Sequence, residues 1–553
     1  MGRSPVLLMF PPQFPPFQPH LAIPSLGSML VRHEVDVHYV DANLAFYYYC
    51  LNAETVAEAL YALEAQVKSS ATDEISLGVL RCLASADEVL SRLASSMSLL
   101  SGRAPGGLDE LLRAQLIVNR ALQIVSRAHG FQMSLQDIRI ESPKAQQGFS
   151  GLLRRFYESH ISNAIKSVHP AAVGMSVATP QQRIGAQRLA QLVRKTVPSA
   201  EVVVGGSIPT YYALVSAARD YFTSWADKVF VGEADETLAS YVCSRLGMPR
   251  NGLPGFVESS GIVSPESVPA MSDLPTPLFD GLPLADYLSP ALVLPLLTSR
   301  GCAWRRCAFC SHSHTYGDSY RPRGMDRLAA DLSIVRSKTN YVSFYDEFIP
   351  LPRLREVAET IAPWELSWSA YARFDTPWTT RVVRSLSESG CKLLSFGLES
   401  ASNRVLQKMD KGITSEMVRD AMRSFEASGV WVHLFVIFGF PTERLSDLDQ
   451  TLALIQEYSH APVSFGLSRF GLNLHSKVYR EPHRYGITRI FEPNSPFSYW
   501  EFEAPDGIPA QVLNQKAQMA RSMLGDRWWQ LLDFAQVFHL FPLTQFREVT
   551  YCT

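Results

Sequence analysis

Three of the chain's eight cysteines stand within nine positions of one another, in the run Cys302-Ala-Trp-Arg-Arg-Cys307-Ala-Phe-Cys310. Thiolates bind zinc and iron–sulfur clusters, and three on one short loop can converge on one metal group. A four-iron cluster is normally held by four cysteines, so three leave one iron open to another ligand. A zinc site instead needs a fourth Cys or His, and His312 and His314 stand close enough to provide one.

The other cysteines are expected to be ordinary structural thiols. Eight cysteines in 553 residues are too few for a disulfide framework. A free cysteine usually packs as a small apolar side chain. The five that we assign to this class are Cys50, Cys82, Cys243, Cys391 and Cys552.

Length and composition predict a sizeable globular protein. The chain is 46% apolar and is long enough for two or three domains. Its 51 Lys and Arg are balanced by 53 Asp and Glu, which disfavours a nonspecific nucleic-acid partner. The first apolar segment, 6–10, is too short for a signal sequence, and no run reaches the roughly 20 apolar residues of a membrane span. We therefore expect a cytoplasmic protein without a membrane partner.

Short apolar segments alternate with helical ones in residues 1–250, which predicts a doubly wound parallel sheet of the Rossmann-like α/β class. Residues 53–160 interrupt this pattern with Ala, Leu, Ser, Glu and Arg at helical spacing, and they predict a helical insertion. Ligands bind outside the carboxyl ends of such strands. The expected strands are 5–10, 35–41, 172–177, 201–206 and 228–233, with helices at 21–32 and 185–196.

A second periodic region carries the cysteines. Residues 251–290, rich in Pro, Ser and Gly, read as a linker. Six strands separated by helical stretches then predict a partial (β/α)6 parallel barrel over 291–480, with the cysteines directly after its first strand. Residues 481–553, which contain Trp500, Trp528 and Trp529, are expected to form a carboxyl-terminal cap. The six strands are expected at 291–298, 341–345, 366–370, 393–397, 432–438 and 463–467.

The cysteine run after a barrel strand resembles the radical S-adenosylmethionine (radical SAM) superfamily. The resembling features are Arg300-Gly-Cys302 followed by Cys307-x-Phe309-Cys310. The resemblance implies a 4Fe-4S cluster held by the three cysteines, whose open iron chelates the methionine group of S-adenosylmethionine (SAM). This chain departs from the usual family pattern because four residues, rather than three, separate Cys302 from Cys307.

The same resemblance implies a set of SAM-binding residues at the ends of the barrel strands. Asp346 and Glu347 match groups that contact the methionine amine, although both could instead cap the next helix. Arg373 could pair with a carboxylate or form a surface salt bridge. The full set is Phe309, Asp346, Glu347, Arg373, Glu399, Ile437 and Gly439.

A doubly wound domain, a linker and a barrel in this order resemble the cobalamin-binding subclass of the superfamily. The sequence lacks the Asp-x-His-x-x-Gly loop that supplies a lower axial histidine in many cobalamin proteins. The nearest match contains His38 within a predicted strand, and we interpret His38 as a packed structural residue. Alternatively, the domain retains the fold without the cofactor. The residues that the resemblance places at cobalamin are Ser176, Gln181, Gln182, Gly205, Gly206, Gly232 and Glu233.

The function that these resemblances imply is a cobalamin-dependent radical methyltransferase. Its substrate would be an unactivated carbon or another poor nucleophile of a small molecule or peptide in a biosynthetic pathway, and its electron donor a flavodoxin or ferredoxin. Tyr316 and Tyr320, just beyond the cysteines, are candidate catalytic residues. Alternatives are transfer of the 3-amino-3-carboxypropyl group, a radical rearrangement or cyclisation, and, from another class, a non-catalytic zinc-binding scaffold.

Overall fold

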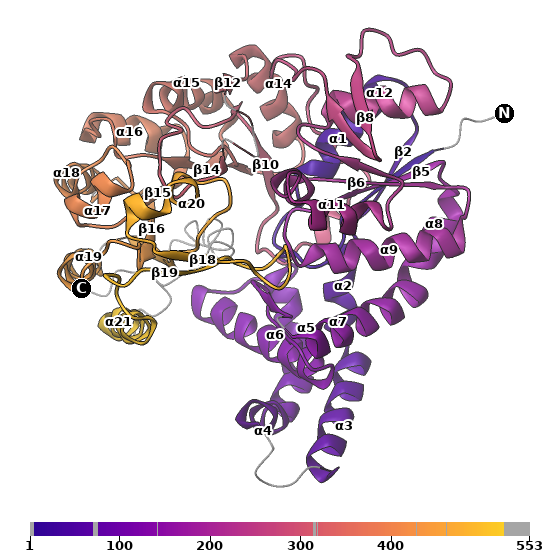
Figure 1. The fold of residues 1–553 in the computed structure, drawn as a ribbon, viewed down its shortest axis with the longest axis horizontal. Coiled ribbons are helices and arrows are strands. Elements are labelled where there is room, and N and C mark those ends of the chain that lie inside the picture. The colour runs from indigo at the N-terminus through magenta and orange to yellow at the C-terminus, as the bar shows by residue number, and fades with distance from the viewer. Residues whose placement is uncertain are drawn as a thin grey trace. The chain divides into compact units, whose positions relative to one another are not determined.

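The computed structural model describes residues 5–69, 76–140, 142–312, 314, 317, 319–426, 428–460 and 462–524 (Figure 1). The chain divides into two compact units. Among the described residues, the first unit contains those up to 269 together with 274–292, and the second contains 270–273 and those from 293 to 524. Among the described residues, no helix is both long and apolar enough to cross a membrane.

The first unit is built on a seven-stranded sheet in the order β2-β1-β5-β6-β7-β9-β8. All neighbours are parallel except β8 and β9, and strand β1, which lies between β2 and β5, is completely buried. The short apolar runs of the sequence therefore form a doubly wound sheet, as predicted. The strands are β1 (Val6–Met9), β2 (Val37–Val40), β5 (Ala172–Ser176), β6 (Glu201–Gly205), β7 (Lys228–Phe230), β8 (Phe256–Ser259) and β9 (Ile262–Pro265).

Helices connect these strands and also form the predicted insertion. In α6, apolar side chains spaced three and four residues apart are buried, which makes it the central helix of the insertion. The connecting helices are α1 (Ala22–Arg32), α2 (Ala42–Cys50), α9 (Gln182–Thr196), α10 (Ser207–Tyr211), α11 (Ser216–Thr223) and α12 (Asp235–Arg245). The insertion contains α3 (Ala53–Ser69), α4 (Leu77–Ala84), α5 (Ala86–Leu100), α6 (Leu108–Ala128), β3 (Gln132–Met133), β4 (Ile138–Arg139), α7 (Pro143–Phe156), a π-helical turn (Tyr157–Ile161) and α8 (Ser162–Val168).

The segment that we expected to be a linker is mostly part of the first unit. Residues 256–265 form the β8–β9 hairpin that completes the sheet. Beyond it, the Tyr287 hydroxyl donates to the buried carboxylate of Asp41 at 2.5 Å, and Phe279 and Leu288 are fully buried. Apolar side chains placed between the prolines and glycines therefore anchor this stretch, which composition alone did not reveal.

The second unit is built on a parallel six-stranded sheet in the order β10-β13-β14-β15-β16-β17. Sheet order follows sequence order, and β10 and β17 are its two edges, as expected of a partial barrel. The strands are β10 (Val293–Leu296), β13 (Tyr341–Phe344), β14 (Ser367–Ala372), β15 (Cys391–Glu399), β16 (Trp431–Phe438) and β17 (Val463–Arg469). The connecting helices are α14 (Met325–Arg336), α15 (Leu351–Ile361), α16 (Thr380–Glu388), α17 (Asn403–Lys408), α18 (Ser415–Phe425) and α19 (Leu445–Glu457).

The described part of the predicted cap consists of a hairpin and a helix. The hairpin pairs β18 (Arg489–Phe491) with β19 (Glu501–Glu503), and Trp500 beside it bridges to Leu472. Helix α21 (Ala510–Met523) packs on α19, where Lys516 pairs with Asp449 at 2.6 Å. Trp528 and Trp529 lie outside the described residues.

Candidate radical SAM site

The cysteine loop, residues 301–312, begins directly after the first strand of the barrel. Two short antiparallel strands close its base, β11 (Ser299–Arg300) and β12 (Arg321–Pro322). Gly301 adopts a φ of 82°, and a side chain there would collide with the Ser319 carbonyl. This glycine lets the chain turn sharply where the loop leaves the barrel.

The three thiols of the loop lie close enough to act on one another electrostatically. Burial, together with the charges of Cys307 and Cys302, raises the pKa of Cys310 to about 12, and burial also raises the pKa of Cys302. Backbone N–H groups donate to two of the sulfurs, from Arg305 to Cys302 Sγ and from His312 to Cys310 Sγ, both at 3.4 Å. Such thiols ionise when a positively charged metal group binds, and the N–H groups then stabilise the thiolates. The donor set therefore fits a cluster.

A single bound ion fits the loop less well. In the described part of the chain, no three His, Cys, Asp or Glu side chains lie close enough to hold one metal ion. A structural zinc needs four such ligands around one point, whereas the cysteines of a four-iron cluster bind different irons. His314 stacks on His475 with ring centroids 3.5 Å apart, rather than joining the cysteines in such a group. The geometry favours a cluster over the zinc alternative.

Residues 409–412 hold the cysteine loop from the side. The Met409 carbonyl accepts from the Ala308 N–H at 2.8 Å, and the Asp410 carbonyl accepts from the Trp304 indole at 2.9 Å. The Trp304 ring occupies the space that a side chain at Gly412 would fill, and Arg305 has a φ of 52°. The longer spacing between Cys302 and Cys307 thus contains a left-handed residue and a tryptophan anchor. We did not predict this anchor.

Arg373 lies against the loop and is buried, so the surface salt-bridge alternative is wrong. Its guanidinium donates to Cys307 Sγ at 3.9 Å, to the Lys411 carbonyl, and to Asp375 at 2.8 Å. It also packs over Trp304, with 4.6 Å between the guanidinium carbon and the ring centroid. The chain thereby keeps a permanent positive charge beside one candidate cluster ligand.

Asp346 supports the turn that leads into the loop. Its side chain is 2% exposed, and both oxygens accept hydrogen bonds, from the Thr298 N–H and hydroxyl at 2.9 Å and from the Ser299 hydroxyl at 2.5 Å. It does not cap the next helix, because α15 begins after Pro350 without a side-chain cap. Glu347 is partly exposed and does not cap it either.

Glu399 forms a buried ion pair at the end of β15. Its carboxylate accepts from Lys411 Nζ at 2.7 Å, and both side chains are less than a tenth exposed. Gly397 leaves the space that the pair occupies, since a side chain there would collide with both groups. Lys411 Nζ also lies over the Phe309 ring, 5.8 Å from its centroid. Lys411, which we did not single out, joins two predicted SAM-binding residues.

The end of β16 combines an apolar strand with a polar turn. Ile437 and Phe309 pack against the same apolar cluster, and Gly439 has a φ of 80°. The Gly439 N–H donates to Glu443 Oε2 at 2.6 Å. Glu443 is fully buried, and burial raises its pKa to about 7. We did not predict Glu443, although its place four residues after Gly439 was a visible signal.

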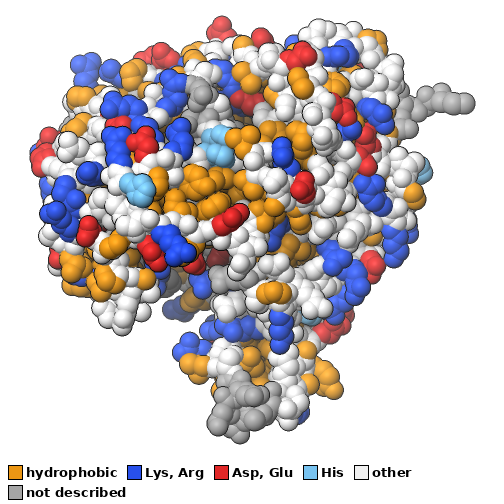
Figure 2. Space-filling view, in the orientation of Figure 1, with side chains coloured by type: hydrophobic (Ala, Val, Ile, Leu, Met, Phe, Trp, Pro, Cys, Tyr) orange, Lys and Arg blue, Asp and Glu red, His pale blue; other side chains and the backbone are white. Residues whose placement is uncertain are grey.

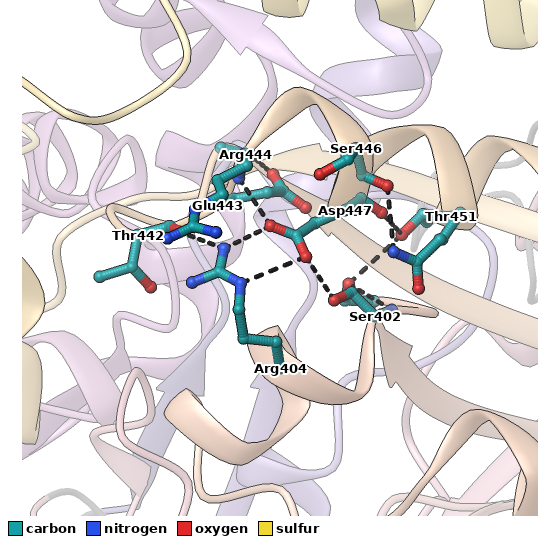
Figure 3. Close-up of polar contacts among 11 residues, drawn as sticks. Ser402, Arg404, Thr442, Glu443, Arg444, Ser446, Asp447 and Thr451 are labelled. Carbon is teal, nitrogen blue, oxygen red and sulfur yellow. Dashed lines mark hydrogen bonds and ion pairs between the residues drawn. The ribbon is translucent and has the colours of Figure 1, made fainter.

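An ion-paired network fixes the helix that follows this turn (Figure 3). Asp447 accepts from Arg404, from the Ser402 hydroxyl at 2.6 Å and from the Arg444 N–H at 2.8 Å. Arg404 also donates to the Thr442 carbonyl. These contacts join the start of α17 to the start of α19 and so position the residues 439–443 between them.

The structure describes only one of the two candidate catalytic tyrosines. Tyr316 lies outside the described residues. The Tyr320 hydroxyl is buried near Ser299, at the base of the cysteine loop, and burial raises its pKa. Tyr320 is therefore placed beside the Asp346 turn.

Gln182 joins two loops at the carboxyl edge of the first unit's sheet. Its Oε1 accepts from the Ala178 and Thr179 N–H groups at 2.7 and 3.0 Å, and its Nε2 donates to the Pro11 carbonyl at 2.6 Å. The side chain is completely buried. Of the predicted cobalamin residues, Gln182 thus positions loops, whereas Gln181 is partly exposed at the start of α9.

One glycine of the same edge, Gly206, sits where backbone approaches backbone. Gly206 has a φ of 112°, and a side chain there would meet the Val177 carbonyl at 2.6 Å. Gly205 and Ser176 end neighbouring strands in register, and Gly232 and Glu233 follow β7. His38 lies in edge strand β2, but its side chain is 48% exposed and 3.6 Å from Asp36, so our expectation of a packed histidine is wrong.

Comparison with known proteins places the barrel in a family. Residues 296–455 match the model of the radical SAM superfamily. An uncharacterized methyltransferase of Pyrococcus horikoshii is 27% identical over 315 residues, which is 55% of this chain and 67% of that protein.

Two solved structures have a similar fold. The cobalamin-dependent SAM radical enzyme OxsB, with aqua-cobalamin and SAM bound, gives a TM-score of 0.54 at 18% identity, over 66% of this chain and 59% of OxsB. The radical SAM methyltransferase TsrM of Kitasatospora setae gives a TM-score of 0.56 at 14% identity, over 96% and 90% of the chains. This chain therefore spans about three fifths of OxsB and most of TsrM.

The doubly wound unit and the partial parallel barrel, with a three-cysteine loop after the barrel's first strand, form a fold similar to those of OxsB and TsrM. Residues 296–455 are a radical SAM domain, and enzymes of that superfamily use a 4Fe-4S cluster and SAM. This domain, together with the similarity to radical SAM enzymes, sets aside the non-catalytic scaffold alternative.

Proposed function

We propose that this enzyme transfers a methyl group from SAM, by way of cobalamin, to an unactivated carbon or another poor nucleophile of a small molecule or peptide. The observation that carries the proposal is the presence in one chain of a three-thiol loop and a second parallel sheet with a glycine-rich carboxyl edge. The similarity to a named methyltransferase and to two cobalamin or methyltransferase structures supports it.

The chain's own residues would hold the two cofactors at separate edges. Cys302, Cys307 and Cys310 would bind the cluster, with Arg373 beside Cys307. We propose that Phe309, Glu347, Ile437 and Gly439, together with the Glu399–Lys411 pair, line the SAM position. Ser176, Gln181, Gly205, Gly206, Gly232 and Glu233 would line the cobalamin position. When bound, these cofactors supply one-electron cleavage of a carbon–sulfur bond and carriage of a methyl group.

Anaerobic reconstitution tests the cofactor content. The protein would be loaded with iron and sulfide, mixed with cobalamin, passed through gel filtration, and examined by absorption and electron spin resonance with and without SAM. We expect a reducible cluster whose signal changes with SAM, and a retained cobalamin spectrum. The Cys307→Ala variant should lose the cluster but keep cobalamin. Retention of stoichiometric zinc instead of iron would contradict the proposal.

The products derived from SAM separate methyl transfer from its alternatives. Transfer of a methyl group to reduced cobalamin leaves S-adenosylhomocysteine and changes the cobalamin spectrum. A 3-amino-3-carboxypropyl transfer would leave 5′-methylthioadenosine, and a rearrangement would give 5′-deoxyadenosine without S-adenosylhomocysteine. We expect S-adenosylhomocysteine in proportion to methylcobalamin, measured by liquid chromatography. Its absence alongside either other product would reassign the reaction.

A further inference from the structure

The barrel sheet has an outer face that packs on helices and an inner face, and the strand register assigns side chains to each. On the outer face, the Phe396 ring packs on Phe425 of α18, with ring centroids 5.7 Å apart. Side chains alternate along a strand, so Ser395 lies on the inner face. The residues in register with it form what we call the inner row. This row consists of Tyr371, Ser395, His433 and Ser464, one from each of β14 to β17.

The inner face leads from this row to the cysteine loop. Phe435 and Ile437 follow His433 on the inner face of β16, and Ile437 packs against the same apolar cluster as Phe309 of the loop. A strand rises about 3.3 Å per residue, so His433 lies about 13 Å from Ile437 along β16. Phe435 and Ile437 are partly exposed, whereas the outer-face side chains of β16 are buried. The inner row is therefore the floor of the face on which we place SAM.

His433 is a buried histidine with one ring nitrogen unpaired. Its side chain is 0% exposed, and burial lowers its pKa to about 3, so the ring is neutral. The Trp431 indole donates to Ser464 Oγ at 3.0 Å, and the Ser464 hydroxyl in turn has one hydrogen, which it donates to His433 Nδ1 at 2.8 Å. An imidazole that accepts at Nδ1 carries its proton on Nε2. Among the described residues, no hydrogen-bond partner lies within reach of this Nε2.

An unpaired N–H group inside a protein is unfavourable, so it points to an acceptor that completes the site. The ligand must supply that acceptor. The barrel supplies the donor at a fixed place, because β16 and β17 hold both ends of the chain of hydrogen bonds that runs from Trp431 to His433.

The inner face next to His433 is aromatic and uncharged. The Phe435 ring meets the His433 ring edge to face, with centroids 4.6 Å apart, and lies within 13° of parallel to the Tyr371 ring. On β14 to β17, all of which the structure describes, the inner face carries only uncharged side chains until Arg373 and Glu399 at the strand ends. Charged side chains of both signs are instead spread over the molecular surface, as Figure 2 shows. Such a lining favours a neutral, planar ligand.

We propose that the inner face of the barrel binds the substrate as a neutral planar ring, whose carbonyl oxygen or ring nitrogen accepts a hydrogen bond from His433 Nε2. The Phe435 side chain turns aside about its side-chain bonds to admit the ring. This inference rests on the proposed function, because it names the substrate class of that reaction. His433 then fixes which edge of the ring faces the floor, and so which edge faces the cofactors.

Two ring probes that differ in one atom test the hydrogen bond. Quinoline has an acceptor nitrogen, and naphthalene has the same shape without one. Their dissociation constants would be measured by anaerobic equilibrium dialysis against the reconstituted protein. The variants are His433→Phe and His433→Leu, which lack the donor, and His433→Gln, whose amide can donate. His483→Phe, at an exposed position of the same unit, is the control.

We expect the ratio of the naphthalene dissociation constant to the quinoline one to fall about tenfold in the two donor-free variants, because one buried hydrogen bond is lost. His433→Gln should keep most of the wild-type ratio, and His483→Phe should match it. Circular dichroism shows which donor-free variant is folded. An unchanged ratio in a folded donor-free variant would overturn the proposal and leave the Nε2–H group directed at the Phe435 ring. Failure of the wild-type protein to bind quinoline would also overturn it.

Spin resonance of the same samples separates this inference from the proposed function. A protein that takes up the cluster and responds to SAM, but shows no dependence on His433, would overturn the ring site alone. A protein that binds quinoline through His433 but takes up no cluster would overturn the proposed function, and with it the assignment of the ring as substrate.

Discussion

Glu443 is a carboxyl group without solvent contact, and only one of its oxygens accepts a hydrogen bond from the described residues. Burial raises its pKa from 4.5 to about 7. As pH rises from about 4.5 to 7, the unfolded chain releases this proton before the folded one does. The free energy of unfolding therefore falls by about 3 kcal/mol across this window and keeps the lower value at higher pH.

Glu443→Gln should remove this pH dependence. The amide cannot ionise, so we expect the free energy of unfolding to increase by about 2 kcal/mol at pH 8 and to change little at pH 5. Urea denaturation of the metal-free chain at the two pH values measures the difference. Glu426→Gln, at an exposed position, is the control. An equal change at both pH values would show that packing, rather than ionisation, is responsible.

Arg373 sets the charge beside Cys307. Reduction adds negative charge to a cluster, so a neighbouring cation favours the reduced state. We expect Arg373→Gln to lower the reduction potential by about 60 mV, the one-electron equivalent of about 1.4 kcal/mol. A potentiometric titration monitored by spin resonance gives this value.

Arg373→Lys keeps the positive charge and should shift the potential less. If the lysine and glutamine variants shifted the potential equally, the role of Arg373 would be to shape the loop through its hydrogen bonds. Arg381→Gln, on the exposed side of α16, provides the background value.

Among the elements, the turn at 409–412 determines how the cysteine loop is held. Gly412→Ala would place a methyl group where the Trp304 ring lies, at a φ of 72°. We expect the variant to retain less than half of the iron that wild type retains after gel filtration, because displacement of Trp304 loosens the loop. Gly429→Ala is a matched control, since it has a φ of 73° and no atom within 4 Å of the added carbon. Equal iron loss in both variants would assign the effect to backbone strain.

The first unit's element-scale prediction concerns Gln182. Gln182→Ala removes three buried hydrogen bonds between the loops that follow β1 and β5 and leaves their backbone groups unpaired. We expect a loss of about 3 kcal/mol in the free energy of unfolding and weaker cobalamin retention. Gln187→Ala, on the same helix, is the comparison. Unchanged stability with reduced cobalamin would instead make Gln182 a direct cofactor contact.

Across the whole molecule, the sequence was most informative where burial and periodicity agree. Every strand expected in the two sheets is present, because short and mostly apolar runs that alternate with helical stretches form parallel strands. Side-chain roles were harder to predict. Asp346 is fixed by Thr298 and Ser299, nearly fifty residues earlier, and His38 faces solvent because β2 is an edge strand. Neither partner nor edge position can be read from local sequence.

The Asp41–Tyr287 hydrogen bond joins residues 246 positions apart, and most of the first unit's sequence lies between them. Contacts of such long range form late, because the intervening chain must first be ordered. During synthesis from the amino terminus, the first unit therefore cannot complete its packing until residue 287 has left the ribosome. The barrel's first strand follows within a few residues. Truncation after residue 250 would leave Asp41 buried without its partner, so the natural boundary for independent expression of this unit lies near residue 292.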